Sequence, residues 1–244
     1  MTQLKFSKSH TETNMRKQKM AATVSMQTHC KNMRSRRNIP VPLQQLLNAD
    51  AYLTEKFCNL SNNFLPLHSL RVHYKILEIT CHGIPWLCLW MVFIWWFDNP
   101  RLYQMQVNFF IGLWLDIALV AVIKAVTRRR RPAANRGDMF ATMGPDKFSF
   151  PSGHASRAAF VAYFLLQLWP VPVWVAMPVL AWATCVCLTR VLLRRHHLLD
   201  VGAGIGLGIL EGMFVGWLWL SHEVSAWLIS WLSDEKLDGG SYHV

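Results

Sequence analysis

The sequence predicts an all-α, polytopic transmembrane helical bundle of about five spans plus interfacial helices. Two observations predict this class. Hydrophobic residues make up 52% of the 244 residues, whereas only 16% are charged. The charged residues are also segregated, because they crowd into positions 1–37, 124–136 and 190–195 with long apolar stretches between them. This segregation is typical of polytopic membrane proteins, whose basic residues gather beside the spans.

Five apolar segments are the candidate spans, at about 79–97, 105–126, 155–169, 173–193 and 200–220. A helix needs about 20 residues to cross roughly 30 Å of hydrocarbon. The first, second and fifth segments meet that length. The third is shorter, and with the fourth it predicts a hairpin that closes at Trp169-Pro-Val-Pro172.

The fifth segment carries glycines at strict four-residue steps: Gly204, Gly208, Gly212 and Gly216. Small residues at this interval form one smooth helix face, which allows the backbone of a neighbouring helix to approach closely. The pattern predicts tight helix packing, and it leaves open whether the neighbour belongs to the same chain or to a second copy.

These segments define four regions. Residues 1–39 are predicted to be a disordered, basic, cytosolic tail with a single acid, Glu12, a composition that also fits a transit peptide. Residues 40–78 mix apolar and charged residues, as interfacial helices do. Residues 79–221 form the transmembrane domain, and 222–244 a short interfacial segment with a C-terminal tail.

Charge and cysteine content exclude other classes. The formal net charge is +11, but the basic clusters flank apolar segments and lack interleaved aromatics, which disfavours nucleic acid as a partner and favours anionic membrane lipids. The six cysteines show no Cys-x-x-Cys and no paired spacing with histidines. We therefore predict free thiols and neither a disulfide framework nor a zinc site.

Three polar clusters lie at the ends of the spans: Lys124 to Pro132, Pro151 to His154, and Thr189 to Asp200. The helical legs on either side of the hairpin turn are each about 25 Å long at 1.5 Å per residue. Arg190 therefore returns to the depth of His154, and the even number of spans brings Arg131 to the same face. Basic clusters that converge without an array of acids to hold a metal predict a phosphate site.

Residue types suggest how this site would bind phosphate. Arg131 and Arg190 offer planar forks of donors for phosphoryl oxygens, and Lys124 adds a point charge. Gly153 permits close backbone approach. Ser152 and the start of the following helix provide O–H and N–H donors to an anion.

Two histidine positions suggest covalent chemistry. His196 and Asp200 are four residues apart, so on one helical turn the carboxylate could accept the imidazole N–H and leave the other nitrogen as a nucleophile. His197 and Asp200 are three apart and could also meet, so spacing alone does not choose between the histidines. His154, from the opposite wall, could donate a proton to the leaving oxygen.

The motifs Lys-x6-Arg-Pro, Pro-Ser-Gly-His and (Ser/Thr)-Arg-x5-His-x3-Asp resemble the three-part signature of the type 2 phosphatidic acid phosphatase (lipid phosphate phosphatase) superfamily. The match runs over 124–200, about a third of the chain. One departure is Thr189, where the family usually has serine, and the hydroxyl is retained. More narrowly, His82-Gly-Ile-Pro-Trp86, the four-arginine run and Asp138-Met-Phe140 resemble the animal polyisoprenoid diphosphate phosphatase branch, which acts on presqualene diphosphate.

This resemblance implies roles for individual residues. His196 would be the nucleophile that becomes phosphorylated, and His154 the general acid. The phosphate would be held, without metal or other cofactor, by Lys124, Arg131, Ser152, Gly153 and Arg190. The family register therefore favours His196 over His197.

Other charged residues have simpler interpretations. Arg128 to Arg130, Arg194 and Arg195 are expected to contact lipid headgroups. Asp116 and Glu211 lie inside spans, where a charge requires a partner, and we expect structural pairing or a neutral carboxyl for both. Asp138 and Asp146 are expected to be solvated loop acids.

The sequence thus predicts a metal-independent membrane phosphatase that hydrolyses isoprenoid diphosphates, such as presqualene or farnesyl diphosphate, through a phosphohistidine. The alternatives are a phosphatase of phosphatidic acid or another phospholipid, and a non-enzymatic membrane scaffold. A transporter is disfavoured because no repeat with paired broken helices is present. The resemblance implies the endoplasmic reticulum membrane and nuclear envelope, and the charge distribution favours a site facing the cytosol.

Overall fold

The computed structural model describes residues 40–64, 71–132 and 148–237. The basic tail 1–39, the loop acids Asp138 and Asp146 and the C-terminal residues 238–244 lie outside these ranges. The chain divides into two compact units, Met1–Leu47 and Asn48–Val244. Of the first unit the structure describes only residues 40–47, mostly the start of one helix, and every contact below belongs to the second unit.

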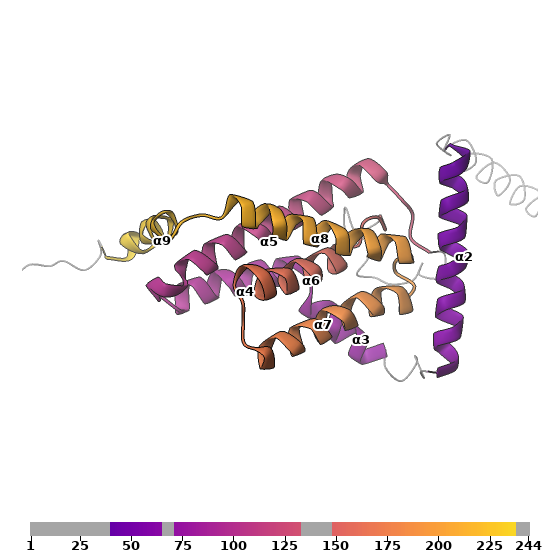
Figure 1. Ribbon diagram of the computed structural model, residues 1–244, viewed down its shortest axis with the longest axis horizontal. Helices are drawn as coiled ribbons and strands as arrows, with labels where there is room; N and C mark the ends of the chain where they lie inside the picture. The colour runs from indigo at the N-terminus through magenta and orange to yellow at the C-terminus, as the bar shows by residue number, and fades with distance from the viewer. Residues whose placement is uncertain (1–39, 65–70, 133–147, 238–244) are drawn as a thin grey trace, which may run out of the picture. The chain divides into compact units, whose positions relative to one another are not determined.

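Helices are the regular elements of the described residues, with one isolated bridge between Arg130 and Phe148 (Figure 1). The predicted all-α class is confirmed. A 3-10 turn, Pro100–Leu102, precedes α5, and a π-helical turn, Phe164–Leu168, extends α6. The helices are α2 (Val41–Phe64), α3 (Arg71–Thr80), α4 (Gly83–Trp96), α5 (Tyr103–Thr127), α6 (Gly153–Tyr163), α7 (Val173–Leu192), α8 (Leu198–Leu218) and α9 (His222–Leu237).

Within the described ranges, three helical stretches are long and apolar enough to cross a membrane: Pro100–Thr127, Val173–Leu192 and Leu198–Leu218. The expected span 79–97 is shorter than predicted, because α4 has 14 residues and reaches only about 21 Å. The chain turns at Cys81, whose carbonyl accepts a hydrogen bond from Arg157 Nη1 at 2.8 Å. Residues 41–64 form one 24-residue helix instead of several short ones.

The glycine face of α8 packs against α6 and its π-helical extension, and the two helices lie side by side (Figure 1). A Cβ added at Gly204 would lie 2.5 Å from the carbonyl oxygen of Ser152, and one at Gly208 would lie 2.1 Å from that of Ser156. The predicted close approach is confirmed, and its partner is a helix of the same chain. It holds the beginnings of α6 and α8 together, where the Ser152 N–H donates to the carbonyl of Asp200 at 3.0 Å.

A buried ion pair crosses the interior of the bundle. Arg157 Nη2 of α6 lies 2.6 Å from Asp116 Oδ2 of α5, and neither side chain is more than 6% exposed. The pairing expected for Asp116 is therefore present. Glu211 of α8 is also buried, and neither of its carboxyl oxygens has a hydrogen-bond partner in the described part of the chain.

Candidate active site

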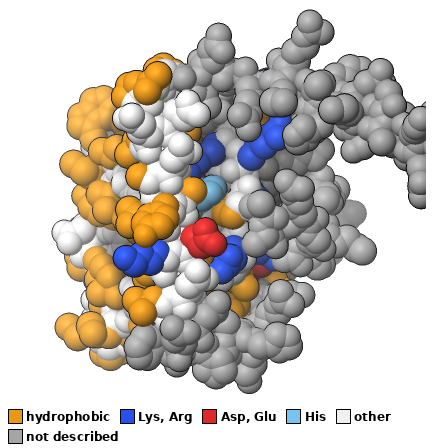
Figure 2. Space-filling model, turned by 90° about the vertical axis from the view of Figure 1, so that its right-hand side faces the viewer, with side chains coloured by type: hydrophobic (Ala, Val, Ile, Leu, Met, Phe, Trp, Pro, Cys, Tyr) orange, Lys and Arg blue, Asp and Glu red, His pale blue; other side chains and the backbone are white. Residues whose placement is uncertain are grey.

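The three polar clusters meet at one end of the bundle, where α5 and α7 end and α6 and α8 begin. Contacts between the clusters establish this directly: the Thr127 hydroxyl donates to the carbonyl of Phe150 at 3.0 Å, and Arg129 pairs with Asp200. Figure 2 views the molecule from the right-hand side of Figure 1 and shows a histidine, basic side chains and an acid gathered beside an apolar area. The predicted convergence is therefore present in the fold.

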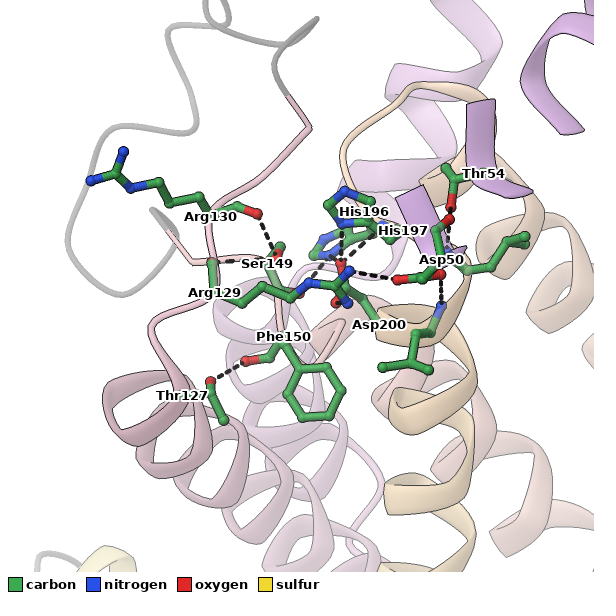
Figure 3. Close-up of polar contacts among 12 residues, drawn as sticks. Asp50, Thr54, Thr127, Arg129, Arg130, Ser149, Phe150, His196, His197 and Asp200 are labelled. Atoms are coloured by element: carbon green, nitrogen blue, oxygen red, sulfur yellow. Dashed lines mark hydrogen bonds and ion pairs between the residues drawn. The ribbon is translucent and has the colours of Figure 1, made fainter. Parts of the chain in front are cut away.

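His196 lies at the centre of this cluster and is 3% exposed. Its Nδ1 is 2.7 Å from the carbonyl oxygen of Ser149, which can only accept, so Nδ1 carries the proton and Nε2 keeps its lone pair (Figure 3). Burial lowers the pKa of His196 to about 3, and the positive charge of Arg131 is the next largest cause. Asp200 opposes this shift, while Lys124 and Arg190 add to it. The imidazole is therefore neutral at physiological pH, as a nucleophile must be.

The expected hydrogen bond between His196 and Asp200 is not formed. Their Nδ1 and Oδ2 atoms are 4.0 Å apart, because His196 does not lie on a helical turn with Asp200. The chain turns through Arg194, in a left-handed conformation at φ 53°, and α8 begins only at Leu198. Asp200 instead accepts from the backbone N–H of His197 at 2.9 Å and lies 3.2 Å from its Nδ1.

This geometry separates the two neighbouring histidines. The ring of His197 is bound to Asp200 next to the start of α8, whereas the positive charges of Arg131, Lys124 and Arg190 act on the ring of His196. The two imidazoles therefore lie in different environments.

Arg190 is buried at the end of α7, with 1% of its side chain exposed. Its Nη1 lies 3.1 Å from Glu78 Oε1 of α3, and Arg195 binds the same carboxylate oxygen. Arg195 was expected to contact lipid headgroups, but it is buried because Glu78 pairs with it. Glu78 carried no motif signal in the sequence.

Buried side-chain nitrogen atoms close to His196 lack hydrogen-bond partners among the described residues. Among the described residues, no hydrogen-bond partner exists for Nε and Nη2 of Arg190 or for Nε2 of His154. A buried polar atom left unsatisfied costs about 1–3 kcal/mol. An anion with several acceptor oxygens, bound between His154 and Arg190, would remove this cost.

Three further predicted residues lie at the start of α6 and the end of α5. Ser152 is fully buried as the N-cap of α6, with its hydroxyl accepting from the N–H of Ala155 at 3.5 Å. Gly153 is the first residue of α6, and a Cβ there would lie 3.1 Å from Val120. Lys124 is buried in the last turn of α5.

Sequence reasoning missed Arg129, which was expected to contact headgroups. Its guanidinium bridges two carboxylates, at 2.5 Å from Asp50 Oδ2 of α2 and 2.7 Å from Asp200 Oδ1 (Figure 3). Asp50 also carried no motif signal. His82 was noted only as part of the branch resemblance, yet its ring centroid is 6.2 Å from that of His154 in an edge-on arrangement.

The chain matches known proteins over this region. The family model of the PAP2 superfamily matches residues 106–224. A probable lipid phosphate phosphatase beta of Arabidopsis thaliana is 39% identical over 141 residues, which cover 48% of this chain and 66%, just under two thirds, of that protein.

Two solved structures share the fold. The first PAP2-type transmembrane phosphatidylglycerolphosphate phosphatase from Bacillus subtilis superposes with a TM-score of 0.51 at 22% identity, over 70% of this chain and 84% of that one. LpxE of Aquifex aeolicus gives 0.50 at 23% identity, over 67% and 94%. At these identities the likeness concerns the fold alone. Motifs, site geometry, family match and fold agree in their resemblance to the PAP2 superfamily over residues 106–224.

Proposed function

We propose that this protein is a metal-independent integral membrane phosphatase that hydrolyses isoprenoid diphosphates through a phosphohistidine intermediate. The observation that carries the proposal is the state of His196, which is neutral, proton-bearing at Nδ1 and surrounded by Arg131, Lys124 and Arg190. An imidazole prepared in this way is a nucleophile placed where a phosphoryl group would bind.

The reaction would take two displacements. His196 Nε2 attacks the terminal phosphorus, a P–N bond forms, and the P–O bond to the leaving group breaks. Burial and the charge of Arg190 lower the pKa of His154, so His154 would first take up a proton with the bound substrate anion and then give that proton to the departing oxygen. Water then attacks the phosphohistidine, His154 takes a proton from that water, and the P–N bond breaks to release phosphate. Arg131, Arg190 and Lys124 would stabilise the charge on the transferring group in both steps.

The lipid part of the substrate has a suitable environment. An apolar cavity of about 520 Å³ lies beside the site, lined by residues of α6, α7 and α8 that include Ala159, Cys187, Val191, Leu198 and Ile205. Val191 directly follows Arg190, and Leu198 begins the helix that follows His196. A prenyl or acyl chain could therefore leave the phosphate site into apolar surroundings.

The choice of a diphosphate rests on the branch resemblance and on His82. The Nδ1 atom of His82 is buried and has no hydrogen-bond partner in the described ranges, and its ring lies beside His154. A diphosphate carries its second phosphoryl group on the leaving side, which is where His154 acts. His82 would contact that group, and a monophosphate substrate would leave it without a partner.

Phosphatidic acid is the second candidate substrate, because the Arabidopsis relative is called a lipid phosphate phosphatase. We also propose residence in the endoplasmic reticulum membrane and nuclear envelope with a cytosolic site, on the strength of the branch resemblance and the charge distribution. The glycine face of α8 is occupied by α6, so any homo-oligomer would have to use another surface.

Purified full-length protein in detergent with excess chelator tests the proposal. It should release phosphate from farnesyl diphosphate faster than from phosphatidic acid, His196→Asn should abolish turnover, and His197→Asn should retain it. Folded wild-type protein that turns over neither lipid would refute the enzymatic reading and favour a scaffold. Loss only through His197→Asn would place the nucleophile one residue later.

A further inference from the structure

The backbone of Arg129 is linked to His196 through Ser149. The carbonyl of Arg129 accepts from the N–H of Ser149 at 2.8 Å and from its hydroxyl at 3.3 Å, and the hydroxyl also lies 3.1 Å from the carbonyl of Arg130. Ser149 is fully buried, and its own carbonyl accepts the Nδ1 proton of His196. The position of the Arg129 backbone therefore sets the position of the group that orients the His196 ring.

The side chain of Arg129 is linked to His197, the neighbour of His196, through Asp200. Its Nη1 binds Asp200 Oδ1, while Asp200 Oδ2 holds the backbone N–H of His197, the residue next to the nucleophile. The Arg129 side chain is 13% exposed and Asp200 is fully buried, so solvent screens this link weakly. Figure 3 shows the Arg129 side chain reaching inward to the two carboxylates, while the side chain of Arg130 points away from them.

Asp50 of α2 holds the other side of the Arg129 guanidinium. Its Oδ2 pairs with Arg129, and its Oδ1 accepts from the N–H of Leu199 at 2.9 Å. One turn further along α2, the Thr54 hydroxyl accepts from the N–H of Leu198 at 3.1 Å. The first amides of α8, which have no partner within their own helix, are thus capped by side chains from a helix far away in the sequence.

We propose that Asp50 and Arg129 are positioning residues for the phosphorylation of His196: Asp50 fixes the Arg129 side chain, and Arg129 holds Ser149 and Asp200, which orient the imidazole and the adjoining backbone. This inference rests on the proposed function. It makes α2, which precedes the three motifs, part of the catalytic apparatus.

The chain offers variants that separate positioning from folding. Asp50→Asn keeps an oxygen for the Leu199 amide but removes the ion pair with Arg129. Thr54→Val removes the cap on Leu198, which costs about 1 kcal/mol of stability, together with the hydroxyl's hydrogen bond to the carbonyl of Asp50, and it leaves the ion pair of Arg129 in place. Arg129→Gln removes the guanidinium that binds both carboxylates. Arg128→Gln is its matched control, because Arg128 is exposed and, among the described residues, its Nε binds only the carbonyl of Ala125.

The measurement is the single-turnover rate of acid-labile phosphohistidine formation from farnesyl diphosphate, beside steady-state kcat and KM and thermal unfolding in detergent. We expect Asp50→Asn and Arg129→Gln each to slow phosphorylation at least tenfold with KM little changed, since a misplacement of about 1 Å can cost a hundredfold in rate. Arg129→Lys should recover part of the loss. Arg128→Gln should match the wild type, and Thr54→Val should lower the unfolding temperature without slowing phosphorylation.

A double-mutant cycle decides whether Asp50 acts through Arg129. If it does, Asp50→Asn combined with Arg129→Gln should be no slower than Arg129→Gln alone. The inference would be overturned if the two substitutions slowed phosphorylation by factors that multiply in the double variant. It would also be overturned by a folded Asp50→Asn variant whose phosphorylation rate is within twofold of the wild type. A wild type that forms no phosphohistidine would instead refute the proposed function, so the two failures are distinguishable.

Discussion

Adding one methyl group at Gly208 should separate the two walls of the active site. The Cβ of an alanine there would lie 2.1 Å from the carbonyl oxygen of Ser156 and 2.9 Å from the N–H nitrogen of Phe160, both backbone atoms of α6 that cannot rotate away. Restoring an ordinary contact of 3.4 Å requires α6 and α8 to move apart by about 1.3 Å. α6 carries His154 and α8 begins two residues after His196, so this movement separates the proposed acid from the proposed nucleophile.

Overpacking of this kind costs about 1–3 kcal/mol of stability, and a displacement near 1 Å can cost about a hundredfold in rate. Gly206 is the matched control, since a Cβ there would meet nothing within 4 Å. Phosphate release and thermal unfolding should be measured for Gly208→Ala and Gly206→Ala in the same detergent. We expect Gly208→Ala to lose at least tenfold in kcat and Gly206→Ala to match the wild type. Equal activity of the two folded variants would refute the link between helix spacing and catalysis.

Three further predictions follow from the same structure. The pKa of His196 is about 3 in the folded site but about 6.5 in an unfolded chain, so the unfolded state binds the proton first as pH falls. Acidification from pH 6.5 toward 3 should therefore lower the free energy of unfolding by about 1.4 kcal/mol per pH unit because of His196. In the His196→Asn variant, a plot of the free energy of unfolding against pH should lack this slope. His82→Ala should lower kcat/KM for farnesyl diphosphate about tenfold more than for farnesyl monophosphate, because the variant loses a hydrogen bond to a charged group. An equal loss of kcat/KM on both substrates would refute a contact between His82 and the second phosphate. Asp116→Leu leaves the Arg157 guanidinium buried without its carboxylate and should lower the free energy of unfolding by about 3–5 kcal/mol. The double variant Asp116→Leu with Arg157→Met should recover much of that stability. An Asp116→Leu variant as stable as the wild type would contradict this prediction.

The meeting of the clusters could be predicted because it depends only on helix length and direction. Counting residues from His154 to the hairpin turn and back to Arg190 requires no knowledge of side-chain contacts, and a fixed rise per residue converts the count to depth. The glycine face was equally predictable, since a four-residue step places the small residues on one side of any helix. The shortening of α4 was not predicted: the chain turns at Cys81, whose carbonyl accepts a hydrogen bond from Arg157, and α4 begins only at Gly83.

The error over Asp200 has a local cause. A four-residue separation brings two side chains together only where the backbone between them is helical. Here α7 has ended and α8 has not begun, and the left-handed Arg194 turns His196 away from Asp200 toward Ser149. Ser149 lies three residues before Ser152, and a backbone carbonyl that acts through position alone leaves no signature in residue type.

Arg129 could not be distinguished from its neighbours in the four-arginine run for a related reason. The spacing from Lys124 identifies Arg131, but only the tertiary position of Asp50 identifies Arg129. That position follows from the environment in which α8 begins. Amides at a helix start beside apolar surroundings need protein acceptors where water is scarce. His197 and Asp200 form a local capping box at the start of α8, whereas the amides of Leu198 and Leu199 are capped from α2, and the carboxylate that caps Leu199 also binds Arg129. The residue that caps Leu199 therefore also holds the Arg129 charge beside Asp200, and this is the physical basis for the proposal that α2 belongs with the site although it lies outside every motif.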